Sequence, residues 1–322
     1  MEVLLHDGDG NILTAQSTID DVISYDDTIT TGRLDALGDA VYNIVVGAHS
    51  MFRLFGKYQG PQARIRRSSD NSEVDAYFDK NGASITPDID TWLSGATGYV
   101  VMWYDQGPTQ NHTRGYALGG ATLPVLFKRT DTGYADTYAI SLAGVGTSVG
   151  NYFQTINSVT FNEGTTGGVS TFTVANFKDI DYYESAFDYN NGVYNNNNLK
   201  LYRSGTGTAL TIIYYAGTTS SGVNLTSANI TNAWKTYGAR VSGANPNWTY
   251  YIRVNPTTTT TVTAGSYSYA NRNHPGSRTL TTNYIGRSSR SDYDLANMDI
   301  ACQIFFNDNL SNSQFGIMEA VF

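Results

Sequence analysis

The sequence predicts an all-β fold, an antiparallel β-sandwich of the jelly-roll type, from its composition and from its pattern of strands and turns. The 322 residues include 32 glycines and 24 tyrosines, and only 15% are charged. Glycine supplies turns and bulges, whereas tyrosine and threonine suit a pleated, half-wet surface. Short strand patterns recur between Gly, Asn and Pro turns, which favours two packed antiparallel sheets.

The stretch from Gly60 to His112 carries the clearest strand signals. Its first part alternates apolar and polar residues on both sides of the turn-forming segment Ser68–Asn71, and this period of two is that of half-buried strands. Its second part holds the run YVVMWY, which is followed by Asp105, Gln106, Gly107 and Pro108. We interpret this run as a core strand that stops at a tight turn.

Residues 1–33 are predicted to form an N-terminal arm, and residues 34–322 a single sandwich domain. The arm is acidic and short of core residues, as loosely packed termini often are. Leu34–Tyr58 is predicted to be one long helix, because its apolar residues recur at spacings of three and four. Leu310–Phe322 is predicted to be a short closing helix capped by Ser311 or Ser313.

Strands and turns are predicted to alternate between Tyr116 and the closing helix. The expected strands are Leu123–Phe127, Ala139–Leu142, Tyr152–Phe153, Gly168–Phe177, Ser185–Tyr189, Leu199–Tyr202, Ala209–Tyr215, Trp234–Val241, Trp248–Val254, Thr260–Ala264, Asn283–Gly286 and Ile300–Phe306.

Charge and cysteine content exclude several classes of partner. With 28 acidic against 20 basic residues and a net charge of −8, the chain is a poor match for the phosphates of nucleic acid. No stretch approaches the roughly 20 apolar residues of a membrane-spanning helix, so we expect no membrane insertion. Cys302 is the single cysteine, which excludes an intrachain disulfide, and the start of the chain lacks the pattern of a signal peptide. We therefore expect synthesis in a cytosol.

Several motifs resemble a known family of sandwich proteins. They are GP followed by RIRRSSDN, then WL, WYDQ and the pair Asn111-His112. Together they resemble the concanavalin A-like catalytic domain of α-L-arabinofuranosidase B, in glycoside hydrolase family 54, and sandwich proteins encoded by large double-stranded DNA viruses. The resemblance covers the chain from about Leu37 to its end and implies a concanavalin A-like β-sandwich.

The resemblance also implies where catalytic carboxylates would lie. In the family the nucleophilic Glu follows a Phe-Asp-Tyr strand, which matches Phe187–Tyr189 here and would place the Glu near Val193. The acid/base Asp follows a late Ile-Gly strand, which here ends at Gly286. Neither matching position is acidic in this chain. A retaining glycosidase needs two carboxylates about 5–5.5 Å apart, so we expect no enzymatic activity.

A carbohydrate-binding site is the alternative that the residues support. Aromatic rings pair with the C–H surfaces of sugars, and Asn and Asp side chains bond their hydroxyl groups. If their loops meet, such a site would contain Asp188, Asn190, Asn191, Tyr194 and Trp248.

The motif residues themselves are expected to have a structural role. In that interpretation Asp105 caps the turn after the core strand, and Asp70 or Asp75 pairs with Arg64, Arg66 or Arg67. We expect no cofactor and no metal site, because no His, Cys or carboxylate pattern has the spacing of metal ligands. The structural residues expected from the motifs are Arg66, Ser68, Asp70, Trp103, Asp105, Gln106, Asn111 and His112.

From the resemblance we expect a non-enzymatic structural protein of a large DNA virus particle, a minor capsid or surface component found in the virion after synthesis in the host cytoplasm. Its partners would be other capsid proteins or copies of itself. The first alternative is a lectin-like protein that binds cell-surface glycans during host attachment. The second is an arabinofuranosidase-like hydrolase with its acids at other positions, such as Glu184 or Asp292.

Overall fold

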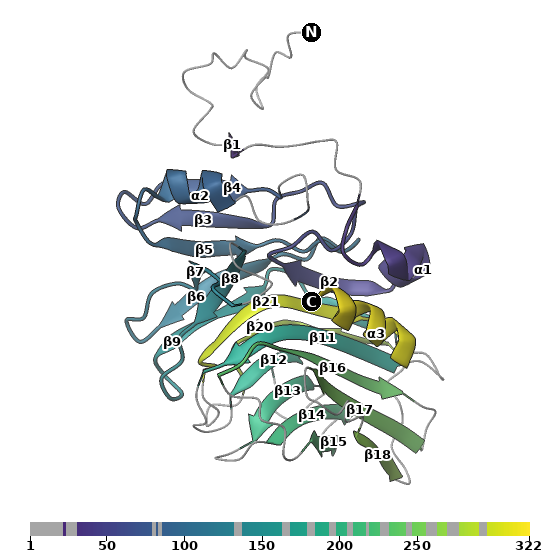
Figure 1. Ribbon diagram of the computed structural model, residues 1–322. Helices are drawn as coiled ribbons and strands as arrows, with labels where there is room; N and C mark the ends of the chain where they lie inside the picture. Colours follow the sequence, from purple (N-terminus) through teal and green to yellow (C-terminus); the bar gives the residue numbers. More distant parts are fainter. Residues whose placement is uncertain are drawn as a thin grey trace.

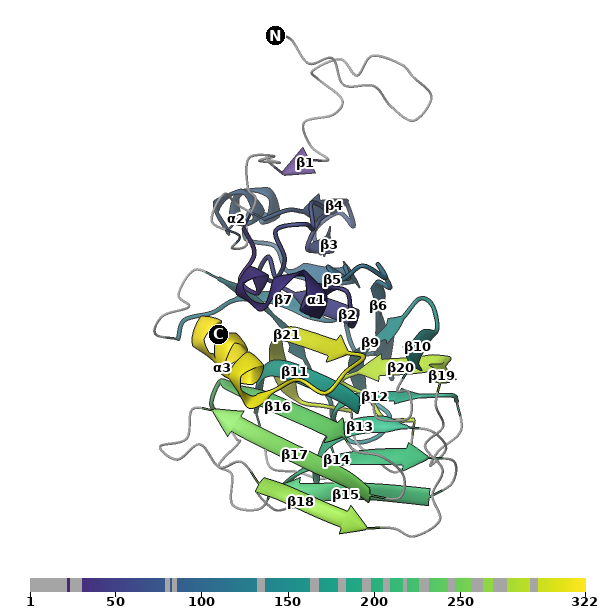
Figure 2. The same cartoon turned by 90° about the vertical axis from the view of Figure 1, so that its right-hand side faces the viewer.

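The computed structural model describes most of the chain as one large antiparallel β-structure (Figures 1 and 2). The described residues are 22–23, 31–78, 82, 86–131, 137–162, 168–178, 184–192, 198–204, 209–216, 219–225, 232–242, 247–255, 263–268, 277–289 and 295–322.

Two ladders of strands both lead to β5 (Gly98–Trp103). In order of pairing, the first ladder contains β18 (Thr263–Ser268), β17 (Asn247–Asn255), β16 (Lys235–Ser242), β11 (Gly168–Phe177), β21 (Met298–Phe306), β8 (Tyr138–Leu142) and β7 (Val125–Lys128). The second contains β15 (Thr219–Leu225), β14 (Ala209–Ala216), β13 (Leu199–Ser204), β12 (Ser185–Asn190), β20 (Thr282–Ile285), β9 (Gly150–Thr155) and β6 (Thr113–Leu118).

The remaining strands extend these ladders. β3 (Ala63–Arg67), β4 (Glu73–Ala76) and β1 (Val22–Ile23) continue the sheet from β5, and β2 (Val45–Ser50) pairs with β21. β10 (Val159–Asn162) and β19 (Ser277–Leu280) pair with each other. Among the described strands, β1 with β4 is the one parallel pair.

The main core lies between the two ladders. Phe305 of β21 lies 4.8 Å from Phe187 and 4.0 Å from Tyr189 of β12, measured between ring centroids. These contacts place alternate residues of β12 against the first ladder. All nine residues of β21 are buried, as expected for a strand covered on both faces.

A second core covers the other face of the first ladder. It contains Phe172 of β11 and Ile304 of β21, together with Phe315 and Met318 of α3 (Asn312–Val321). Figure 1 shows α3 along this side of the sheet. A Cβ added at Gly238 of β16 would lie 2.9 Å from the Phe315 ring, so this glycine lets α3 approach the strand closely.

The predicted all-β sandwich is confirmed, and so is the closing helix. Ser311 caps α3: its Oγ accepts a hydrogen bond from the backbone N–H of Gln314 (3.2 Å), and the Gln314 side chain accepts one from the N–H of Ser311 (2.7 Å). This reciprocal pair is a capping box. Of the predicted N-terminal arm, the described residues are 22–23 and 31–33.

The single long helix predicted over Leu34–Tyr58 is wrong. The segment forms a 3₁₀ turn η1 (Asp35–Leu37), a short helix α1 (Gly38–Tyr42) and the strand β2. Every residue of β2 is buried, so the strand shows no alternation of apolar and polar residues that would separate it from a helix. The helix α2 (Thr86–Leu93), which we did not predict, packs Ile89 and Leu93 into the main core.

The Asp105 carboxylate joins β2 to the turn after β5. Its Oδ1 accepts the backbone N–H groups of Ala48 (2.7 Å) and Gly107 (2.8 Å). Its Oδ2 accepts the backbone N–H of Asn111 (2.7 Å) and the hydroxyl of Thr109 (2.8 Å). Four donors on a fully buried carboxylate make this turn a fixed part of the fold.

Replacing Asp105 by alanine is expected to lower the free energy of unfolding by roughly 3–5 kcal/mol, because four buried donors lose their acceptor. Urea denaturation would measure the change. Asp70→Ala is the matched control, since the Asp70 carboxylate is partly exposed to solvent. The urea concentration at the midpoint of unfolding should change little in this variant. An equal loss for both variants would contradict the role of Asp105.

His49 of β2 is expected to make stability depend on pH. Burial lowers the pKa of His49, and the nearby Asp105 opposes this shift only in part. The unfolded chain therefore takes up a proton near the ordinary histidine pKa of about 6.5, whereas the folded chain does not. The free energy of unfolding should fall as pH drops below about 6.5. Measured between pH 7.5 and 5.5, this slope should be smaller in His49→Gln; equal slopes would contradict the assignment.

Candidate functional site

The strand register places a row of polar side chains on the face of the second ladder that points away from the main core. Residues directly opposite each other in antiparallel strands share a face. The pairs are Lys200 with Asp188, Asp188 with Tyr284, Tyr284 with Gln154, Gln154 with Arg114, and Arg114 with Met102. We call this side the open face.

The alternate residues of the same strands face the core. Phe187, Leu201, Ile285 and Phe153 belong to the main hydrophobic cluster and are almost completely buried. The alternation therefore separates an apolar inner face from a polar and aromatic outer face along four neighbouring strands.

Three tyrosines and one arginine form what we call the tyrosine face. The rings of Tyr116 and Tyr152 stack at 5.4 Å with an interplanar angle of 15°, and Tyr284 meets Tyr152 edge to face at 5.5 Å. The Arg287 guanidinium lies 4.6 Å from the Tyr152 ring and 5.0 Å from the Tyr284 ring. Burial raises the pKa of Tyr284, which Arg287 opposes, so its hydroxyl stays protonated at neutral pH. Tyr116 is 37% exposed, which leaves its ring accessible.

Beside the tyrosine face lies a buried polar group, the Asp188 cluster. Asp188 Oδ2 accepts hydrogen bonds from the Ser288 hydroxyl (3.1 Å) and from the Ser289 backbone N–H (2.8 Å) and hydroxyl (2.9 Å). Lys200 Nζ donates to Ser288 Oγ (2.5 Å) and lies 3.7 Å from Asp188 Oδ2. Asn198 Nδ2 approaches Asp188 Oδ1 at 3.4 Å. The charge of this fully buried carboxylate is thus balanced by a lysine and fixed in orientation.

Of the five predicted sugar-binding residues, the structure brings Asp188 and Asn190 together on β12. The Asn190 side chain accepts the Gly192 N–H (2.7 Å) and so shapes the following turn, where Gly192 has φ +84°. Asn191 lies at the start of this turn and is half-buried. Tyr194 lies outside the described residues, and of Trp248 the structure describes the backbone alone, on β17 opposite Tyr267.

Most of the expected structural residues lie in the turns next to β3 and β5. Arg67 pairs with Asp70 and Arg64 with Asp75, at 2.6 and 2.8 Å. Arg66 lies over the Tyr99 ring at 5.8 Å. The Ser68 hydroxyl accepts the N–H of Thr97.

The others surround the Asp105 turn. Trp103 is buried in the main core, and the Gln106 side chain bonds the backbone of Ser50, Phe52 and Leu54. The Asn111 amide donates to the carbonyl of Asn157 at 3.1 Å.

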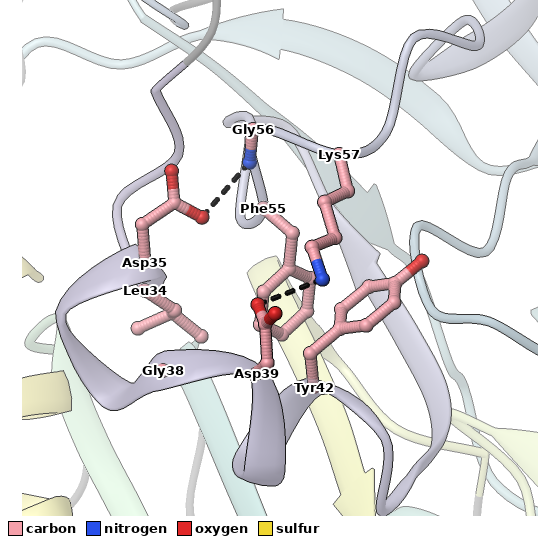
Figure 3. Close-up of a pocket in the computed structure, with 8 residues that line it drawn as sticks. All are labelled: Leu34, Asp35, Gly38, Asp39, Tyr42, Phe55, Gly56 and Lys57. Carbon is pink, nitrogen blue, oxygen red and sulfur yellow. Dashed lines mark hydrogen bonds and ion pairs between the residues drawn. The ribbon is translucent and has the colours of Figure 1, made fainter.

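Two hollows adjoin α1 and the segment after β2. The first has a volume of about 260 Å³ and lies between α1 and the segment after β2 (Figure 3). Within it Asp35 accepts the Gly56 N–H (2.9 Å), and Lys57 pairs with Asp39 (2.7 Å). Because these polar groups already bond each other, we do not place the candidate site there.

The second hollow, of about 380 Å³, adjoins the first at Tyr42 and Lys57 and is also lined by Tyr104 and His112. His112 Nδ1 accepts the Asp105 N–H (3.1 Å), and its ring meets Tyr104 edge to face at 4.9 Å. Burial lowers the pKa of His112, so the ring is neutral at pH 7 and carries its proton on Nε2.

The tyrosine face and most of the Asp188 cluster were not predicted from the sequence. The available signal was one tyrosine in each of the strands TRGYAL, GNYFQT and TNYI. Only the strand pairing shows that these positions share a face with Asp188. The contacts of Lys200, Ser288 and Ser289 span up to 101 residues of sequence, so no local pattern indicates them.

Within the described residues, no helix is long and apolar enough to cross a membrane, and no group of three or more His, Cys, Asp and Glu side chains is arranged to hold a metal ion.

Solved structures of arabinofuranosidases share this fold. A family 54 α-L-arabinofuranosidase soaked with a cyclic sulfate inhibitor matches 90% of this chain, with a TM-score of 0.61 and 15% identity. An arabinofuranosidase complexed with arabinofuranosyl-α-1,2-xylobiose matches 90% of this chain, with a TM-score of 0.60 and 15% identity. A mutant family 54 α-L-arabinofuranosidase soaked with 4-nitrophenyl α-L-arabinofuranoside matches 90% of this chain, with a TM-score of 0.56 and 17% identity. The chain spans 64–65% of the length of these proteins. No protein-family model and no curated protein matches the sequence.

The chain is therefore a concanavalin A-like β-sandwich that resembles the family 54 domain. This comparison contradicts our prediction that the chain is not an enzyme, because enzymes share its fold over 90% of its length. That prediction assigned catalytic positions from two short motifs, and an identity of 15–17% does not fix such correspondences. The alternative acid Glu184 is buried in an ion pair with Arg203 at 3.1 Å, and Asp292 lies outside the described residues.

Proposed function

We propose that the protein binds an oligosaccharide on the open face of the second ladder, across the tyrosine face and beside the Asp188 cluster. The observation that carries this proposal is the contiguous set of three tyrosine rings next to a fixed carboxylate. Tyrosine presents an apolar ring to the C–H surface of a sugar and a hydroxyl group to its oxygen atoms. The rings accessible to a glycan are Tyr116 and the half-buried Tyr284, whereas Tyr152 and the Asp188 carboxylate are buried and support them.

Support also comes from the pre-organisation of these side chains. Tyr152 and Tyr284 are held by each other and by Arg287, so a ligand needs to order few rotamers on binding. Tyr116 forms the accessible end of the row. The fold likeness points in the same direction, because one of the similar enzymes is complexed with an arabinofuranosyl-xylobiose.

Hydrolysis of a glycoside at the same face is a second candidate function. It is favoured by the fold likeness to arabinofuranosidases. Asp188 is the carboxylate that the described residues place beside the tyrosine face. Hydrolysis requires a second carboxylate at a suitable separation. We therefore place binding before hydrolysis.

The role in a virus particle stays a prediction from the sequence. The similar structures named above are enzymes, and they neither support nor oppose particle assembly.

Replacing Tyr116 by alanine is expected to weaken glycan binding roughly tenfold, which corresponds to about 1.4 kcal/mol of lost stacking. Titration calorimetry with arabinofuranosyl-xylobiose and a panel of other oligosaccharides would measure it. Stability should change little, since the ring is partly exposed.

Tyr251→Ala is the control, because Tyr251 of β17 is likewise a tyrosine with a ring contact, to Arg240 at 3.9 Å, but belongs to the first ladder. Its affinity should equal that of the wild type. Equal losses in both variants, or no binding of any glycan by the wild type, would contradict the proposed site.

Hydrolysis is tested by release of 4-nitrophenolate from 4-nitrophenyl α-L-arabinofuranoside. The wild type should release it, and Asp188→Asn should reduce the rate on the order of 10²–10⁴-fold, the range for a lost proton-transfer group. Asp39→Asn, at an exposed ion pair, should retain the full rate. No release by the wild type on a panel of aryl glycosides would exclude hydrolysis of these substrates while leaving the binding proposal intact.

A further inference from the structure

Two arginines of the open face lack a carboxylate partner among the described residues. Arg114 is exposed on β6 and Arg287 half-buried after β20, and neither forms an ion pair within the described part of the chain. Arg64, Arg67 and Arg129 each pair with an aspartate. Arg66 and Arg240 also form no ion pair among the described residues, but they lie on other strands, β3 and β16. Arg114 and Arg287 are distinguished by sharing one face with the tyrosine rings.

Both arginines flank the same tyrosine rings. Arg114 lies two residues before Tyr116 on β6, on the same face of the strand, and opposite Gln154. Tyr116 is paired with Tyr152, over which Arg287 lies at 4.6 Å. The two arginines therefore adjoin the same pair of stacked rings, Arg114 along β6 from Tyr116 and Arg287 over Tyr152.

The N–H donors of Arg287 are available to a ligand. Its guanidinium carbon lies within 5.0 Å of the centroids of Tyr152 and Tyr284, whose rings are almost perpendicular to each other. Within the described residues, no hydrogen bond or ion pair uses its N–H groups. A planar array of donors with a full positive charge matches a carboxylate, which it can bind through two parallel hydrogen bonds.

The nearest acid of the open face does not neutralise this charge. Asp188 already receives three hydrogen bonds from Ser288 and Ser289, and Lys200 balances its charge. Counted over the described residues alone, the tyrosine face therefore carries a local positive charge, on a protein whose net charge is −8. The net charge disfavours anionic ligands elsewhere on the protein, so this local charge is selective.

We infer that the glycan bound at the tyrosine face carries a carboxylate, as a uronic acid does, and that Arg287 binds this carboxylate with Arg114 alongside. This inference rests on the proposed glycan-binding function and specifies its ligand class. Arg287 would determine specificity, whereas the tyrosine rings would supply binding common to neutral and acidic sugars.

The test compares two xylo-oligosaccharides of the same length, one with a glucuronosyl branch and one with an arabinofuranosyl branch, by titration calorimetry. The acidic ligand is expected to bind at least tenfold more tightly at low salt. This preference should shrink as sodium chloride is raised, because the charges are partly exposed to solvent. Arg287→Gln should remove the preference for the acidic ligand while leaving the affinity for the neutral ligand within about twofold of the wild-type value. Arg114→Gln should reduce the preference for the acidic ligand in part.

Arg64→Gln is the matched control, since Arg64 already pairs with Asp75, and it should keep the preference. If the neutral ligand binds as well as the acidic one, or if Arg287→Gln lowers both affinities equally, the inference is wrong while glycan binding stands. If a sulfated branch binds more tightly than the glucuronosyl branch, the assignment to a carboxylate is wrong. If neither xylo-oligosaccharide nor any other glycan binds, the proposed function itself fails.

Discussion

The register of antiparallel pairing places the strand residues of the candidate site. Asp188, Tyr284, Gln154 and Arg114 come from four strands, and each lies opposite its neighbour across one ladder. A shift of one residue in any of these strands would turn its polar side chains into the core and its core-facing side chains outward. The contacts of Phe187 and Tyr189 with Phe305 oppose such a shift, so core packing between the ladders fixes the chemistry of the outer face.

The fold class followed from the sequence because strand alternation and turn residues are local signals. β11 agrees with its prediction at both ends, Gly168 and Phe177, and the polar turn after β3 was also recognised. The prediction of a helix over Leu34–Tyr58 failed for a physical reason. A strand buried on both faces, like β2, lacks the alternation of buried and exposed residues that marks a half-buried strand, and its pairing with β21 identifies it.

The candidate site was predictable only in part, because its partners are distant in sequence. Asp188 stood out through its motif, yet the donors that fix its carboxylate follow β20, about a hundred residues later. The same distance explains why the missing acids near Val193 and Gly286 misled the prediction on activity. A catalytic or binding group is defined by its neighbours in space, and two motif positions do not fix those neighbours.

One feature at the edge of the sheet concerns behaviour in concentrated solution. Val22 and Ile23 of β1 pair in parallel with Asp75 and Ala76, on the side of β4 away from β3. An uncovered edge strand offers a row of N–H and C=O groups that another chain can extend, and this is a common route to aggregation. By occupying this position with its own backbone, the N-terminal segment denies part of that edge to other molecules. Two residues of backbone can thus protect an edge against pairing with a second chain.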